Sequence, residues 1–208
     1  MARTRSRDYD LVRQSILDCA AKLFAANGFA STSINDVAEA SGLSKAGVYH
    51  YFDSKSEILS TMLTRHLEAV TEIVDTALNT SEPPRSKFVD LTRLLLEKYS
   101  QPESRNQHAV LMRDMDSLPA KDREFVVATE RRIVRAVDRL LQNIKPDLEK
   151  FKGVTRPLTM LYFGMINWTD NWYSNEGHLA PTELATLAAE LFLNGLARTD
   201  YSAIRKRR

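Results

Sequence analysis

The sequence predicts an all-α protein, and three observations support that prediction. Hydrophobic residues recur at helical spacing through most of the chain, and glycine and proline number only 7 each among 208 residues. No alternating segment rich in valine, isoleucine and threonine and bounded by turns is evident, so no β-sheet is expected. A hydrophobic share of 43% is sufficient for a substantial core, in one domain or in two small ones.

Four helices are expected in the N-terminal third of the chain. The first has apolar residues at helical spacing and ends at Gly28, because glycine commonly terminates helices. Thr32 or Ser33 provides an N-cap for the second, and Ser54 with Glu57 has the spacing of a capping box that opens the fourth. The expected ranges are about 9–27, 33–40, 45–51 and 55–78.

Five further helices are expected after Pro83-Pro84, where a helix cannot continue. Pro157 and Pro181 suit the first turn of a helix, where the amide hydrogen that proline lacks would have no intrahelical partner. The expected ranges are about 86–99, 104–115, 119–144, 157–174 and 181–196.

The segment 32–60 has the residue pattern of a helix-turn-helix. Ala38 is small enough for a second helix to cross close above it, and Gly42 can take the positive φ that a sharp turn needs. Val48 would fix the second helix to the core, while its other face carries compact, hydrogen-bonding and basic residues. Such a face suits the major groove of DNA. The alternative is that the two helices serve packing alone.

This segment resembles the TetR/AcrR family of bacterial transcription regulators. The matching positions are Gly28-Phe29, Thr32-Ser33, Val37-Ala38, Ser41-Gly42-Leu43-Ser44, Val48-Tyr49, Phe52 and Ser54-Lys55. Ala46 and Tyr51 depart from the pattern, since the family often has glycine and histidine there. The resemblance implies a DNA-binding domain over residues 1–55 and, over residues 56–208, a helical bundle that dimerises and binds a small effector.

DNA contacts are expected from the third helix and its flanks. The first 60 residues contain equal numbers of basic and acidic side chains, so phosphate binding depends on where the cations lie. Arg3, Arg5 and Arg7 form a basic arm that follows DNA or remains a solvated tail. The expected DNA-contacting residues are Thr32, Ser33, Ser44, Lys45, Ala46, Gly47, Tyr49, His50, Tyr51 and Lys55.

A stretch near the C-terminus, residues 163–173 with matches at 177, 179, 183–185 and 191–192, resembles TetR members that sense acyl-CoA thioesters. Trp168 and Trp172 would stack on one face of the helix expected there, beside a row of Asn167 and Asn171. Aromatic walls with a few amides suit an amphiphilic ligand. Packing of both indoles in the core or in a dimer is an equally good interpretation.

Effector contacts are expected from several helices of the C-terminal bundle. Arginines 131, 135 and 139 form one row that either holds the phosphates of CoA or is a solvated face near Glu130 and Asp138. The expected effector-contacting residues are Phe88, Leu91, Leu95, His108, Met112, Met115, Phe125, Thr129, Arg132, Asn167, Trp168, Asn171 and Trp172.

The last two helices are expected to form a dimer interface. They are rich in leucine, alanine, glycine and aromatic residues, and two copies would make a four-helix bundle under two-fold symmetry. Burial of the same face within one monomer is the alternative. The expected interface residues are Leu184, Leu187, Ala188, Leu191 and Phe192.

Other classes of protein find little support. The chain has no H-E-x-x-H, G-x-S-x-G, Walker or G-x-G-x-x-G motif, and Cys19 alone offers neither a disulfide nor a zinc site. No apolar run is long enough to span a bilayer, and a cytoplasmic location is expected. The prediction is therefore a homodimeric repressor without cofactor or metal, released from a palindromic operator by an effector. An acyl-CoA from fatty-acid, sterol or aromatic-acid degradation is the preferred effector, and a drug-like or aromatic molecule without CoA is the alternative.

Overall fold

The computed structural model describes residues 2–174 and 176–203, apart from the side chains of residues 2–6, 170 and 203. This part of the chain is all-helical, as predicted, with nine α-helices and short 3-10 segments between them. Its internal contacts define two compact units. The first unit contains Met1–Glu68 and Pro102–Val127, and the second contains Ala69–Gln101 and Ala128–Arg208. The domain boundary after residue 55 stays a prediction, because contact density alone does not say which segment folds independently.

The first unit is built around α1, against which α2 and α6 both pack. Its buried side chains come from elements far apart in sequence, for example Phe24 of α1, Val48 of α3 and Leu111 of α6. The elements are α1 (Ala2–Asn27), α2 (Ile34–Ala40), α3 (Lys45–Tyr49), the start of α4 (Lys55–Leu78), α6 (Pro102–Asp114), the 3-10 helix η1 (Met115–Ser117) and the start of α7 (Ala120–Ile144).

Local sequence explains where these helices begin and end. Gly28 and Gly42 have φ values of 87° and 69°, so both turns use the left-handed conformation that glycine adopts without strain. Ser33 caps α2 in a capping box with Asp36, and the resulting hydrogen bonds lower the pKa of that carboxyl group. The Ser54 hydroxyl oxygen accepts from the amide of Glu57 at the start of α4, as expected.

One expectation about the N-terminus was wrong. α1 begins at Ala2, so the segment expected to be an arm before residue 9 is part of the helix. The side chains of Arg3 and Arg5 lie outside the described residues.

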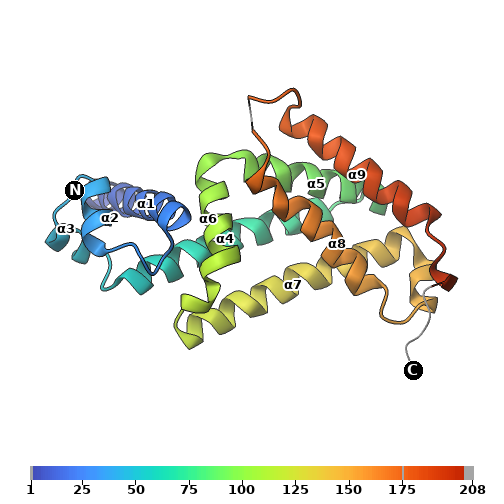
Figure 1. Ribbon diagram of the computed structural model, residues 1–208, viewed down its shortest axis with the longest axis horizontal. Helices are drawn as coiled ribbons and strands as arrows, with labels where there is room; N and C mark the ends of the chain where they lie inside the picture. Colours follow the sequence, from blue (N-terminus) through green and yellow to red (C-terminus); the bar gives the residue numbers. More distant parts are fainter. Residues whose placement is uncertain (1, 175, 204–208) are drawn as a thin grey trace. The chain divides into compact units, whose positions relative to one another are not determined.

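The second unit has α5, α8 and α9 at its centre. α5 packs extensively against α9, and the two lie side by side in Figure 1. Phe88, Tyr162 and Phe192 join the three helices through ring contacts with centroids 4.7 to 5.5 Å apart. The elements are the remainder of α4 and α7, α5 (Pro84–Ser100), η2 (Pro146–Lys150), α8 (Thr155–Asn167), η3 (Trp168–Asn171), α9 (Pro181–Arg198) and η4 (Tyr201–Ala203).

The expected helix over residues 157–174 was wrong at its C-terminal end. α8 stops at Asn167, and Trp168–Asn171 form a 3-10 turn. Because a 3-10 turn has three residues per turn, Trp168 and Trp172 do not form the α-helical row that their spacing suggested. No described helix is both long enough and apolar enough to cross a membrane.

Two buried histidines of the first unit carry a testable consequence for stability. His66 of α4 and His108 of α6 have ring centroids 5.6 Å apart, and burial lowers the pKa of His108 to about 4. The unfolded chain therefore binds a proton at His108 more readily than the folded chain does. The stabilisation is complete above the ordinary histidine pKa of about 6.5 and is lost as the pH falls towards the folded value.

We expect His108 to contribute about 2 kcal/mol to the stability lost between pH 7.5 and pH 5. Urea unfolding of the wild type and of His108→Gln at both pH values measures this contribution. The wild type should lose about 2 kcal/mol more than the variant over that range, because only the wild type can protonate residue 108 on unfolding. Equal losses for the two proteins would contradict the assignment to His108.

Candidate nucleic-acid interface

The outward face of α3 is exposed and polar. Val48 is fully buried, while Lys45, Ala46 and Tyr49 are exposed, with 45% of Tyr49 accessible. The hydroxyl oxygen of Ser44 caps the helix by accepting from the amide of Gly47 at 3.0 Å. A short helix fixed at its start and anchored by one buried valine thus presents an ammonium group, a phenol and two small residues to solvent. Groups of this kind contact DNA phosphates and base edges.

An aromatic cluster holds the end of α3 against α1. The rings of Tyr9 and Tyr51 have centroids 4.7 Å apart, and His50 lies against both of them at 5.2 to 6.2 Å. Tyr9 was not among the predicted site residues, since it lies well before the motif in sequence. His50 remains exposed despite these contacts, whereas Tyr51 is half-buried.

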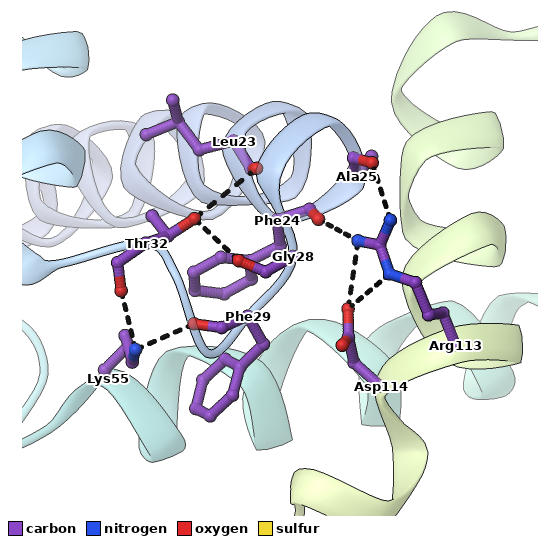
Figure 2. A network of polar contacts seen from close by, with 9 residues as sticks. All are labelled: Leu23, Phe24, Ala25, Gly28, Phe29, Thr32, Lys55, Arg113 and Asp114. Atoms are coloured by element: carbon purple, nitrogen blue, oxygen red, sulfur yellow. Dashed lines mark hydrogen bonds and ion pairs between the residues drawn. The ribbon is translucent and has the colours of Figure 1, made fainter.

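The turn between α1 and α2, residues 28–33, is held from within (Figure 2). The Lys55 ammonium group donates to the carbonyl oxygens of Phe29 at 2.7 Å and Thr32 at 2.6 Å, and it lies over the Phe29 ring. The Thr32 hydroxyl donates to the Gly28 carbonyl at 2.8 Å, and its side chain is buried. On the other side, Arg113 of α6 donates to the carbonyl oxygens of Phe24 and Ala25.

Two of the expected DNA-contacting residues have their hydrogen-bond partners inside the protein. The Thr32 side chain is 2% exposed and the Lys55 ammonium group is occupied by backbone carbonyls, so both stabilise the turn instead of pointing into solvent. Sequence spacing could not reveal the role of Lys55, because its acceptors are backbone oxygens more than 20 residues away. The remaining expected contacts, all at least partly accessible, are Ser33, Ser44, Lys45, Ala46, Gly47, Tyr49, His50 and Tyr51.

The expected effector-contacting residues are divided between the two units. His108, Met112, Met115 and Phe125 belong to the first, and Met112 and Phe125 are about half exposed. The other nine belong to the second unit, where their environments differ widely. Buried in its core are Phe88, Leu91 and Leu95, whereas the exposed members are Arg132, Trp168, Asn171 and Trp172.

Three of these residues of the second unit have informative surroundings. Trp168 and Trp172 expose 65% and 58% of their surface, so neither indole is packed in the core of the part of the chain that the structure describes. Next to Trp168, the side-chain oxygen of Asn167 is buried and has no hydrogen-bond partner in the described part of the chain. A buried acceptor of this kind is costly unless a donor reaches it.

Arg132 is already engaged, since it forms an ion pair with Asp75 at 2.8 Å. A cleft of about 520 Å³ lies elsewhere in the second unit, and none of the expected effector-contacting residues lines it. Pro84, Lys145 and Leu193 are among the residues that do.

The expected dimer residues occupy two sides of α9. Leu184 and Ala188 are buried within the second unit, and Phe192 stacks on Phe88 with centroids 5.3 Å apart. In contrast, Leu187 and Leu191 are exposed by 48% and 63%. On α8, Met160 and Leu161 are also exposed. Burial within the monomer thus explains three of the five residues, and the exposed apolar residues of α8 and α9 form a separate set.

Comparison with known proteins covers both parts of the chain. A family model described as bacterial regulatory proteins of the tetR family matches residues 16–62, and one described as a tetracyclin repressor-like C-terminal domain matches residues 81–196. The HTH-type transcriptional repressor KstR2 of Mycolicibacterium smegmatis is 25% identical over 200 residues, which are 90% of this chain and 92% of that protein.

Solved structures agree with these matches. A TetR-family transcriptional regulator from Bordetella parapertussis is 37% identical, with a TM-score of 0.84 over 91% of this chain and 97% of its own. The structure of AibR in complex with isovaleryl coenzyme A and operator DNA has a TM-score of 0.75 over 86% of this chain and 97% of its own. At 19% identity, that likeness concerns the fold alone.

The resemblance found in residues 32–60 is therefore confirmed and extended to the C-terminal helices. The matches also place the chain among regulators and not among enzymes. No group of three or more candidate metal ligands occurs among the residues whose placement is described. The turn at Gly42 leads into an exposed α3, and family models match both parts of the chain. The protein therefore belongs to the TetR family of DNA-binding transcription regulators.

Proposed function

We propose that this chain is a homodimeric repressor that leaves a palindromic operator when an acyl-CoA thioester binds to its second unit. The observation that carries the effector assignment is the pair of exposed indoles beside the buried acceptor of Asn167. Pantetheine amides would supply the missing donor, and the indoles would cover an acyl chain. The repressor name of KstR2 and the operator–isovaleryl coenzyme A complex of AibR support the same function.

DNA recognition would require two copies of α3. In a two-fold dimer, recognition helices about 34–36 Å apart enter successive major grooves, which makes a palindromic operator the expected target. Leu187 and Leu191 of α9, with Met160 and Leu161 of α8, provide an apolar surface for that dimer. Exposed leucines on adjacent helices are costly in water, and pairing with a second copy would remove them from it.

Release would follow from unequal affinity of the effector for two conformations. An effector that binds more tightly to the conformation with misplaced recognition helices shifts the population away from DNA. Arg131, Arg135 and Arg139 are exposed on α7 and could meet CoA phosphates, whereas Arg132 is neutralised by Asp75. The alternative is an aromatic or drug-like effector that needs the indoles but not the arginines.

Tyr49→Ala is expected to weaken operator binding by about 1–3 kcal/mol, because the phenol is an exposed group of the recognition helix. Gel shifts on a duplex selected from a random pool measure the change, and circular dichroism verifies folding. Lys152→Ala, which changes an exposed lysine of the second unit, is the control and should leave affinity unchanged. Wild-type affinity in Tyr49→Ala would remove Tyr49 from the interface.

Leu191→Arg is expected to convert the dimer to monomer, since a charged group would be buried at the apolar surface of α8 and α9. Light scattering at tens of micromolar measures the mass. Leu11→Arg is a matched control, because Leu11 is 62% exposed and Leu191 is 63% exposed. A monomeric wild type, or a dimer in both variants, would contradict this interface.

A cognate acyl-CoA is expected to release DNA at concentrations where the free acid does not, because the acid lacks the pantetheine amides and phosphates. Trp168→Ala should blunt release while sparing DNA affinity, since the exposed indole is proposed to cover the acyl chain. Isothermal titration with matched acid and CoA-ester pairs, alongside fluorescence anisotropy of labelled operator, measures both effects. Equal affinity for the members of every pair would exclude CoA recognition and favour the alternative effector.

A further inference from the structure

The C-terminal end of α1 is capped by a side chain from another helix. The last carbonyl groups of an α-helix have no intrahelical donors and carry partial negative charge. In the first unit, Nη1 of Arg113 donates to Ala25 at 3.0 Å, and Nη2 donates to Phe24. Gly28 also donates its amide to Phe24, so one carbonyl oxygen serves two donors. An arginine from α6 thus completes the cap that the glycine begins.

Asp114 fixes the orientation of that arginine. Its Oδ2 accepts from Nε of Arg113 at 3.2 Å and from Nη2 at 3.1 Å, and the Asp114 side chain is largely buried (Figure 2). The guanidinium plane is therefore held between a carboxylate on its own helix and two carbonyls on α1. A planar fork with several donors can satisfy this arrangement, whereas the single ammonium group of lysine cannot reproduce it.

The capped end of α1 is followed by the helix-turn-helix, which consists of α2 and α3. The turn of residues 28–33 leads directly into Ser33, the N-cap of α2, and α2 packs against α3. Lys55 and Thr32 tie the carbonyls of this turn together, so the turn follows the end of α1 as one piece. A continuous set of contacts thus leads from α6 through the end of α1 to α2 and α3.

We propose that Arg113 is a positioning residue for DNA recognition, acting through the end of α1 on the placement of α3. It lies outside residues 16–62, the segment that matches the DNA-binding family model. The part of the chain that determines DNA binding would therefore include α6, which begins about fifty residues after the end of α3. This inference rests on DNA binding by the family, and the identity of the effector does not enter it.

The experiment measures DNA affinity without effector, on a duplex selected by the wild-type protein from a random pool. Arg113→Ala should lower affinity about tenfold, the change that corresponds to losing one charge-assisted hydrogen bond. The affinity of Arg113→Lys should lie between those of the wild type and Arg113→Ala, because one ammonium group can reach a single carbonyl. Lys152→Ala removes an exposed cationic side chain of the second unit and is the control, with wild-type affinity expected.

Two further measurements separate positioning from other roles. If Arg113 contacted a DNA phosphate directly, Arg113→Ala would make the dependence of affinity on salt shallower by about one unit, whereas loss of a positioning role leaves that slope unchanged. In a double-mutant cycle, Arg113→Ala should lower DNA affinity less in the Tyr49→Ala background than in the wild type. Once the Tyr49 contact is absent, displacing α3 removes fewer contacts with DNA.

Several results would overturn the proposal: wild-type affinity in Arg113→Ala, a shallower salt slope, or effects that add in the cycle. A purely structural role predicts wild-type affinity once binding is corrected for the folded fraction seen by circular dichroism. If Arg113→Ala does not fold, Arg113→Lys and Asp114→Asn decide, and wild-type affinity in both contradicts the proposal.

Discussion

The backbone carbonyls at the end of α1, which have no donors within the helix, are the constraint on which the first unit depends. A helix that must stop at Gly28 leaves acceptors that glycine alone cannot satisfy. Two cationic side chains from distant segments supply the donors: Arg113 caps the helix end, and Lys55 binds carbonyl groups of the following turn. These long-range hydrogen bonds hold the turn that leads into α2, and α2 packs against α3.

Two cationic side chains of the first unit, those of Lys55 and Arg113, point to backbone oxygens. Each of them donates hydrogen bonds to carbonyl groups of the protein. The cationic group on the outer face of α3 is that of Lys45. The ring of His108 lies against that of His66, and burial lowers the pKa of His108 and so favours its neutral state. The polar and charged groups named here thus mainly stabilise the fold of the first unit, and a few exposed groups remain accessible on α3.

The second unit divides its apolar residues between two purposes. The rings of Phe88, Tyr162 and Phe192 unite α5, α8 and α9 into a core. Inside it, the hydroxyl groups of Tyr162 and Thr92 form a hydrogen bond of 3.1 Å, and the Thr92 hydroxyl donates to the Phe88 carbonyl. The residues left outside, including Leu191 and the two tryptophans, cannot belong to that core in this conformation. Their exposure is what a binding surface of a regulator would require.

Sequence by itself determined the helical class, most helix boundaries within one or two residues, the glycine turns and the inward face of the helix-turn-helix. These features follow from local rules, namely apolar periodicity, capping and the freedom of glycine. Tertiary structure alone decided that Lys55 and Thr32 serve the turn, that Arg113 caps α1, and that the helix before Trp168 changes to a 3-10 turn. The reason is physical: the partners of a hydrogen-bonding side chain are atoms in space, and residues such as Arg113 and Phe24 meet only after the chain has folded.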